Sequence, residues 1–240
     1  MHRRLREESE DVDLLDLVFA DDRSVAGRPW VMFNMVASVD GATAVDGRSS
    51  ALNDEDDKAL FSALRAVPDA ILVGAGTVRA EDYGPVGLDE DRRSRRVERG
   101  LAPTPKLAIA TASLSLEPEM RVFGDPEHRP LIITSTDVDD EDLVRFEGRA
   151  DIVQLDDLGT APILGALGDV DVVLCEGGPT LNGQIIGDGY IDELNLTVSP
   201  LVAVGSSQRI AQGDSRPPVD MRLDRSLRGE KSLFLRYVRE

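Results

Sequence analysis

Short runs of branched apolar residues recur along this chain, and each is followed by a polar or helix-forming stretch. The longest is Trp30–Ser38, a near-continuous apolar run that ends before the turn dipeptide Asp40-Gly41. An apolar run without alternation indicates a strand buried on both faces, as in parallel sheets covered by helices. We expect further strands at Ala70–Val73, Leu107–Ala110, Leu131–Thr134, Ile152–Leu155 and Val170–Cys175. Strands that alternate with helices predict an α/β fold with a mainly parallel central sheet.

Helices and a terminal hairpin complete this expected fold. A leading helix over Asp11–Ala20 is broken by Gly27-Arg28-Pro29, which predicts an N-terminal extension over residues 1–28 and a single domain over 29–240. The tail alternates apolar and polar residues around Gly229 and predicts an antiparallel hairpin. Further helices are expected from the Asn53-Asp54 cap to Ala66, near Thr77–Glu81, and over Thr180–Ile186, with the hairpin strands at Asp220–Leu227 and Ser232–Tyr237.

Charge and cysteine content exclude several classes of protein. The chain has 27 Lys+Arg against 45 Asp+Glu, a net charge of −18, which disfavours binding to nucleic acids and anionic membranes. The single Cys175 cannot form an internal disulfide, and two histidines leave no metal-ligand pattern and no Ser–His–Asp arrangement. Residues 1–10 carry charges of both signs, so we expect no signal peptide, and no apolar stretch reaches membrane-spanning length. We therefore expect a cytoplasmic protein without a metal, whose chemistry a cofactor carries.

Two glycine-rich turns directly follow predicted strands. One is Gly74-Ala75-Gly76-Thr77, and the other is Glu176-Gly177-Gly178-Pro179-Thr180. Glycine lets a backbone approach a ligand closely, and the free N–H groups at the start of the next helix favour phosphate oxygens. Both turns open at the carboxyl edge of the expected sheet, where ligands bind in open α/β folds. Together they predict one extended, phosphate-bearing ligand.

The dense charge run Asp89–Gly100 has two possible interpretations. It is either a solvated helix or loop held by acid–base pairs, or an arginine patch that faces a phosphate.

Several short motifs occur in the order found in one enzyme family. They resemble the reductase domain of the bifunctional deaminase-reductase of riboflavin biosynthesis, which has the dihydrofolate-reductase-like fold. The similar region runs from about Trp30 to Val238, and the zinc signature of the deaminase half is missing, which implies a stand-alone reductase. The motifs are Ala37–Gly41, Leu64-Arg65, Asp69–Val78, Cys175–Asn182 and Ile191–Leu194.

The resemblance implies an NADPH-dependent reductase that opens the ribose ring of a ribosylaminopyrimidine 5′-phosphate to give the ribitylamino product. It also implies a homodimer. Asn34 stands where the fused bacterial enzymes have a lysine. The implied cofactor-binding residues are Gly74, Gly76, Thr77, Glu81, Thr111, Ser113, Gly177, Gly178, Pro179, Thr180 and Leu181, and the implied substrate-binding residues are Asn34, Ser49, Ser50, Arg65 and Glu176.

Two carboxyl groups are candidates for the proton transfer that accompanies hydride addition, Asp40 and Glu176. Asp40 could instead form its turn through an Asx-type bond. Two other functions stay open at this point. One is a dihydrofolate or pterin reductase on the same fold, because an acidic side chain can pair with either aminopyrimidinone. The other is an NADPH-binding protein without catalysis.

Overall fold

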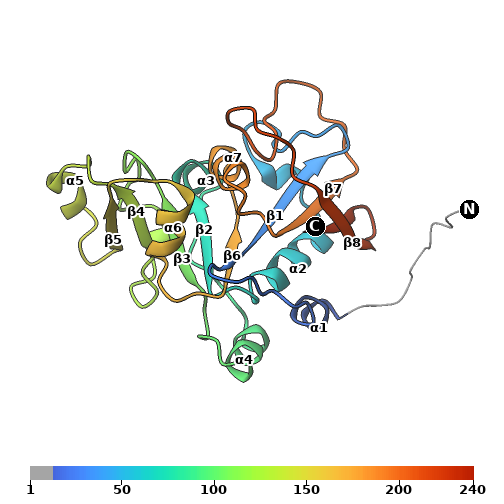
Figure 1. Ribbon diagram of the computed structural model, residues 1–240, viewed down its shortest axis with the longest axis horizontal. Coiled ribbons are helices and arrows are strands. Elements are labelled where there is room, and N and C mark those ends of the chain that lie inside the picture. Colours follow the sequence, from blue (N-terminus) through green and yellow to red (C-terminus); the bar gives the residue numbers. More distant parts are fainter. Residues whose placement is uncertain (1–12) are drawn as a thin grey trace, which may run out of the picture.

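The branched runs of the sequence lie side by side as strands of one sheet. The computed structural model describes residues 13–240, and within them nine strands are ordered β5-β4-β3-β2-β6-β1-β7-β9-β8, from left to right in Figure 1. The strands are β1 (Trp30–Ser38), β2 (Ala70–Gly74), β3 (Lys106–Ala110), β4 (Leu131–Ser135), β5 (Asp151–Leu155), β6 (Val172–Cys175), β7 (Glu193–Ser199), β8 (Met221–Arg228) and β9 (Leu233–Arg239).

Strands β1 to β7 are parallel, and β9 runs antiparallel to both β7 and β8. The predicted α/β fold, its parallel sheet and its terminal hairpin are therefore confirmed. The helical segments are α1 (Leu14–Phe19), η1 (Ser49–Leu52), α2 (Glu55–Leu64), α3 (Ala75–Ala80), α4 (Glu90–Glu98), η2 (Arg121–Phe123), α5 (Asp140–Val144), α6 (Thr160–Ala166) and α7 (Pro179–Gly187). None of the helices in residues 13–240 is long and apolar enough to cross a membrane.

Each central strand contributes to two apolar cores, one on either face of the sheet. On β1, Met32 joins one core while Val31 and Phe33 join the other. Because neighbouring side chains of a strand point to opposite faces, two covered faces require an unbroken apolar run. Helices α1, α2 and α3 cover the first face, and α6 and α7 cover the second.

The leading helix forms within its predicted span. Asp13 caps α1, since its carboxylate accepts hydrogen bonds from the backbone N–H groups of Leu15 and Asp16. The predicted start at Asp11 lies outside the described residues. The expected boundary between extension and domain, at residue 28, stays a prediction.

The charge run Asp89–Gly100 folds as α4, capped by Asp89. Its Arg96 is fully buried, and its guanidinium donates to the carbonyl oxygens of Ala66, Pro68 and Ala102. Burial lowers the pKa of Arg96 to about 10, so it is still charged at neutral pH. This arginine therefore satisfies backbone carbonyls that follow α2, and it does not face solvent.

Strand β7 is missing from the sequence-based prediction. Its polar residues Glu193, Asn195, Thr197 and Ser199 are buried, while its leucines and valine are only half-buried. The usual rule that the apolar residues of an alternating strand point inward therefore fails here. It fails because the buried face of β7 meets charged partners.

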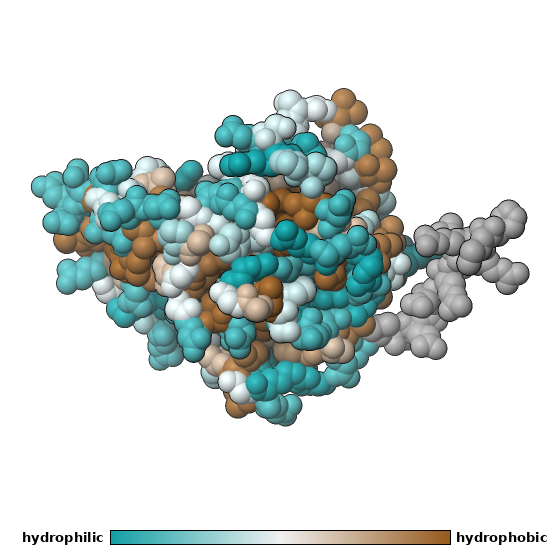
Figure 2. Space-filling model, in the orientation of Figure 1, coloured by the Kyte–Doolittle hydropathy of each residue, from teal (hydrophilic) through white to brown (hydrophobic). Residues whose placement is uncertain are grey.

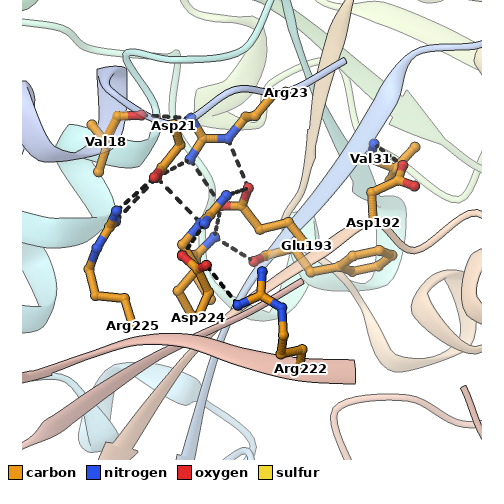
Figure 3. Close-up of polar contacts among 12 residues, drawn as sticks. Val18, Asp21, Arg23, Val31, Asp192, Glu193, Arg222, Asp224 and Arg225 are labelled. Carbon is orange, nitrogen blue, oxygen red and sulfur yellow. Dashed lines mark hydrogen bonds and ion pairs between the residues drawn. The ribbon is translucent and has the colours of Figure 1, made fainter. Parts of the chain in front are cut away.

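Those partners form a buried ion-pair network (Figure 3). Arg23 donates to both carboxylate oxygens of Glu193, at 2.9 and 3.0 Å, and Arg236 of β9 donates to the same group at 2.9 Å. Asp21 pairs with Arg225 of β8 at 2.7 Å. The network thus joins the segment before β1 to β7, β8 and β9.

The network predicts a specific loss of stability in acid. Burial raises the pKa of Glu193, but Arg23 and Arg236 outweigh this effect and lower it from 4.5 to about 2. A pKa lower in the folded state than in the unfolded state stabilises the fold fully above pH 4.5. That contribution, roughly 3 kcal/mol, is then lost as the pH falls from 4.5 toward 2.

Glu193→Gln should therefore lower the free energy of unfolding at neutral pH by about 3 kcal/mol. The difference from wild type should shrink as the pH approaches 2, measured by denaturant unfolding across the acid range. Glu117→Gln is the matched control, because Glu117 forms only an exposed pair with Arg145 and is 66% exposed. A constant difference between Glu193→Gln and wild type across this range would contradict the prediction.

Candidate active site

A cavity of about 800 Å³ opens at the carboxyl ends of the parallel strands. Its walls come from β1, the turns after β2, β3 and β6, and one face of α2. All of the predicted cofactor-binding and substrate-binding residues line it, namely Asn34, Ser49, Ser50, Arg65, Gly74, Gly76, Thr77, Glu81, Thr111, Ser113, Glu176, Gly177, Gly178, Pro179, Thr180 and Leu181. The roles of these residues stay predictions, but their common location is a finding.

The two glycine turns contact each other within this cavity. The backbone N–H of Gly74 donates to the carbonyl of Gly177 at 2.6 Å. A Cβ at Gly74 would lie 3.2 Å from the Gly178 nitrogen, and a Cβ at Gly178 would lie 2.8 Å from Thr77 Oγ1. The turns therefore require glycine because a second backbone or a hydroxyl occupies the space of a side chain.

Two helices begin at this contact and lie on opposite faces of the sheet. Helix α3 follows neighbouring strand β2 and packs into the first core, and α7 follows β6 and packs into the second. Neighbouring strands whose helices leave to opposite faces open a crevice between them, which is the usual ligand site of open α/β sheets. The free N–H groups of the first turn of α7 favour an anion there. These N–H groups therefore lie where the sequence predicts a phosphate-bearing ligand.

A polar group lies at the end of the cavity beside β3. The hydroxyls of Ser113 and Ser115 are 2.7 Å apart, and Thr111 is nearby in the lining. Arg79 of α3 donates to the Ser115 carbonyl at 2.6 Å and also lines the cavity. The sequence prediction includes Thr111 and Ser113 but not Arg79, which comes two residues after the first glycine turn. An exposed arginine beside two serines can bind a phosphate.

Arg65, Glu176 and Tyr83 form one hydrogen-bonded group in the cavity wall. The guanidinium of Arg65 donates to both oxygens of Glu176, at 2.8 and 2.7 Å, and to the Tyr83 hydroxyl at 2.6 Å. Tyr83 donates to Glu176 at 2.5 Å. Burial and the nearby Glu176 charge raise the pKa of Tyr83 well above 10.0, which keeps its hydroxyl protonated.

This pairing changes what Arg65 can do for a ligand. Burial lowers the pKa of Arg65, but the Glu176 carboxylate outweighs it and the net direction is upward. The Arg65 guanidinium also lies 4.1 Å above the ring of Phe61. Its bidentate donors therefore hold Glu176, whereas the family resemblance implies that Arg65 binds the substrate.

Glu81 and Asp40 are placed differently from the other candidates. The carboxylate of Glu81 accepts a hydrogen bond from the Ser49 backbone N–H at 2.7 Å, so it fixes the segment that carries Ser49 and Ser50. Asp40 does not line the cavity. Its carboxylate accepts from the Ser38 hydroxyl and the Ala203 N–H, which lower its pKa. These bonds hold the Asp40 carboxylate in its own turn, outside the cavity.

Helix α2 contributes Asp57 and Phe61 to the cavity wall, and its C-terminal cap contributes Arg65. Residues four apart lie on one face of a helix, so these three face the cavity together. The sequence predicts this helix without singling out Asp57, and only its spacing from Arg65 could have pointed to it.

The chain resembles known proteins both in sequence and in fold. A sequence model of the RibD C-terminal domain matches residues 29–235. The chain belongs to this family. The RibD-type chain is 30% identical over 180 residues to the riboflavin biosynthesis protein RibD of Mycobacterium tuberculosis H37Rv, a match that covers 75% of this chain and 44% of that protein. It therefore spans less than half the length of that relative.

Two further relatives match the RibD-type chain over most of their length. The 2,5-diamino-6-ribosylamino-4(3H)-pyrimidinone 5′-phosphate reductase of Archaeoglobus fulgidus is 27% identical over 194 residues, covering 78% of this chain and 88% of that protein. The crystal structure of a pyrimidine reductase-like protein from Corynebacterium diphtheriae matches with a TM-score of 0.82 at 24% identity, covering 95% of this chain and 99% of that one. The predicted family and fold are confirmed.

The contact between the glycine turns can be tested in this RibD-type domain. Gly178→Ala should weaken dinucleotide binding, because its Cβ would lie 2.8 Å from Thr77 Oγ1 and would displace that hydroxyl or the turn that carries it. We expect at least a tenfold rise in the Kd for NADPH, measured by fluorescence titration. Gly165→Ala in α6 is the control, since its Cβ would meet nothing within 4 Å. Equal Kd values for Gly178→Ala and wild type would contradict the prediction.

Proposed function

We propose that this chain is an NADPH-dependent reductase that converts a ribosylaminopyrimidine 5′-phosphate to its ribitylamino form. The observation that carries the proposal is the crevice between β2 and β6, where joined glycine turns and Glu176 share one cavity of a RibD-type domain. The name of the Archaeoglobus fulgidus relative supports this substrate class.

The reaction needs a hydride and a proton at defined places. When bound, NADPH supplies the hydride to C1′ of the sugar, and the ring oxygen must gain a proton as the ring opens. The residues that would hold the dinucleotide are those of the two turns, with its pyrophosphate against Gly177–Leu181 and the first turn of α7. Ser49 and Ser50, held by Glu81, would contact the phosphate or ribityl chain of the substrate. Holding both reactants in one cavity supplies proximity and orientation.

Glu176 is the proposed centre of proton transfer, in preference to Asp40. Its carboxylate is 5% exposed, lines the cavity, and is oriented by Arg65 and Tyr83. Arg65 is then a positioning residue that fixes the orientation of the Glu176 carboxylate in the cavity wall. Asp40 is occupied in its own turn.

The decisive experiment follows NADPH oxidation with the diamino and the deaminated ribosylaminopyrimidine phosphates and, in parallel, dihydrofolate. Wild type should reduce a pyrimidine phosphate. Glu176→Gln should lower kcat by about 100-fold, because positioned acid–base groups contribute at this level. Asp40→Asn should change kcat by less than about threefold, and thermal melts should show both variants folded. If only dihydrofolate is turned over, the protein is a pterin reductase. If NADPH binds tightly and none of the three substrates is turned over, the protein is a non-catalytic NADPH-binding protein.

The preference for NADPH over NADH rests on the polar group beside β3. NADPH differs from NADH by a 2′-phosphate, and Arg79 with Ser113 and Ser115 offers one cation and two hydroxyls for it.

Replacing Arg79 should therefore change cofactor preference more than rate. Arg79→Gln is expected to raise KM for NADPH by about tenfold, the effect of one charge-assisted hydrogen bond. KM for NADH and kcat with saturating NADPH should stay near the wild-type values, measured by steady-state kinetics with both cofactors. Equal changes in the KM values for the two cofactors would contradict a 2′-phosphate contact.

We further propose that the protein forms a homodimer and that it acts in the cytoplasm. Brown, apolar residues gather at the upper right of Figure 2, where the loops beside β1 and β7 lie in Figure 1. In these loops Val39 is 64%, Val202 70% and Val204 94% exposed, and the Val39 N–H donates to the Leu201 carbonyl. Neighbouring exposed apolar side chains favour contact with a second copy of the chain.

A further inference from the structure

A long connection without helix or strand links β7 to β8 and passes beside the cavity. It runs over residues 200–220, and Figure 1 draws it in orange to red above α7 and β1. Two of its side chains, Gln208 and Ile210, line the cavity. Connections of this length in a compact domain usually have a function. We call its central part, Ser207–Gln212, the strap.

Helix α7 holds one end of the strap. The Asn182 side chain donates to the Ile210 carbonyl at 2.7 Å, and the Gln212 N–H donates to the Pro179 carbonyl at 2.8 Å. A Cβ at Gly183 would lie only 1.7 Å from the Gln212 oxygen. The strap backbone therefore docks into a notch of α7 that only glycine leaves open.

The Asn182 side chain also connects the strap to the strands of the sheet. It is 1% exposed, and its amide donates to Met35 Sδ of β1 at 3.1 Å. Its oxygen accepts from the Cys175 thiol at 3.3 Å, and Cys175 directly precedes the second glycine turn. One buried amide thus fixes the strap relative to both β1 and that turn.

The loop after β1 holds the other end of the strap. The Ser207 hydroxyl accepts from the N–H groups of Thr43 and Ala44, at 3.1 and 3.2 Å. The Thr43 hydroxyl donates to the Gln208 carbonyl at 2.9 Å. Both Thr43 and Ala44 line the cavity. The strap therefore bridges α7 and the loop after β1, and both of these form cavity wall.

The order of the strands places the strap at one particular end of a bound dinucleotide. The group proposed to hold the 2′-phosphate lies beside β3, and the proposed pyrophosphate site is the turn after β6. Strands β3, β2, β6 and β1 are neighbours in that order. A dinucleotide that begins at β3 and crosses the β6 turn therefore continues toward β1 with its nicotinamide half. There Ile210 offers an apolar side chain and Gln208 an amide.

We propose that the strap is part of the dinucleotide site and covers the nicotinamide half, held in place by Asn182. This inference rests on the proposed function, because it assigns a further contact to the same cofactor. A docked strap restricts the motion of the nicotinamide and so helps to keep the hydride near C1′. A dinucleotide that contacts only the docked strap must stabilise docking by the same factor by which docking tightens its binding.

Trypsin reports directly on docking of the strap. Arg209 is exposed at its centre, between two residues whose carbonyl groups are hydrogen-bonded. The only other arginine or lysine in residues 200–220 is Arg216, which precedes a proline and so resists trypsin. Cleavage after Arg209 requires the strap to leave its partners, so its rate follows the undocked population.

The first measurement is this cleavage in wild type with and without NADPH. We expect saturating NADPH to slow cleavage after Arg209 at least about tenfold, because ligand binding draws the strap into its docked state. Mass spectrometry of the fragment that begins at Ile210 gives the rate.

Two comparisons separate contact with the strap from general stabilisation of the fold. Adenosine 2′,5′-bisphosphate carries the adenosine and the 2′-phosphate of NADPH but no nicotinamide, so at saturation it should leave cleavage after Arg209 unchanged. Arg99 is exposed at the end of α4, and cleavage after it should not respond to NADPH.

Two variants should undock the strap from different sides. Gly183→Ala places a Cβ where the Gln212 carbonyl lies. Asn182→Leu keeps the shape of the side chain but removes the donor to Ile210. Without ligand, both should be cleaved after Arg209 at least about tenfold faster than wild type, the effect of one lost buried hydrogen bond.

The NADPH Kd of these variants provides a quantitative check. By reciprocity, it should rise by the same factor by which NADPH slows cleavage of wild type. Fluorescence titration measures this Kd without turnover, and thermal melts report whether each variant is folded. Gly165→Ala in α6 is the control, since its Cβ meets nothing within 4 Å and neither its cleavage nor its Kd should change.

The outcomes separate the inference from the proposed function. Turnover of a pyrimidine phosphate together with cleavage after Arg209 that NADPH does not slow would overturn the inference while the reductase function stands. Equal protection by adenosine 2′,5′-bisphosphate, equal protection at Arg99, or a wild-type Kd in folded Gly183→Ala would also overturn it. Specific protection by NADPH without turnover of any substrate would support the strap and contradict the reductase. Absence of NADPH binding would contradict both.

Discussion

The close approach of two backbone turns organises this molecule. Gly74 and Gly177 are joined by a hydrogen bond between turns that leave neighbouring strands toward opposite faces of the sheet. A side chain at Gly74 or Gly178 would fill that space, so the sequence there is constrained by geometry before any ligand is considered. Because α3 and α7 start on either side of the contact, their N-termini converge on one crevice. The cavity, the two helix N-termini that meet at it and the position of Glu176 all follow from it.

The polar face of β7 connects this site to the rest of the fold. Glu193 holds the segment before β1 and the terminal hairpin through Arg23 and Arg236, and two residues later Asn195 donates to Glu193. Thr197, on the same face, reaches the Asp57 carboxylate. One strand thus carries a buried polar ladder that begins as a structural ion-pair network and ends at the cavity wall formed by α2. Buried polar groups of this kind require every partner to be present.

Periodicity and turn residues within a short stretch of sequence predict the elements of this fold that depend on interactions between nearby residues. The bounds of β1, the glycine turns and the hairpin follow from periodicity and turn chemistry, and every predicted ligand-binding residue lines one cavity. Long-range pairing accounts for what was missed. Arg65 and Glu176 lie 111 residues apart, so nothing local indicates that the arginine is already engaged. The buried face of β7 is polar, so its periodicity does not predict a strand, and nothing local in the sequence indicates that Asp57 is buried against Thr197 of β7.

The charged composition of helix α4 gives no sign that one of its residues is buried and has a structural role. Its residues are mostly charged and exposed, as in a surface insertion that a protein engineer would trim. Yet Arg96 reaches from it under α2 to three carbonyl groups, two of them in the bend before β2 where Pro68 interrupts the backbone pattern. Removing the segment would leave those carbonyls buried without donors. A shortened version of this protein would therefore need a substitute donor at the base of the strand that leads into the first glycine turn.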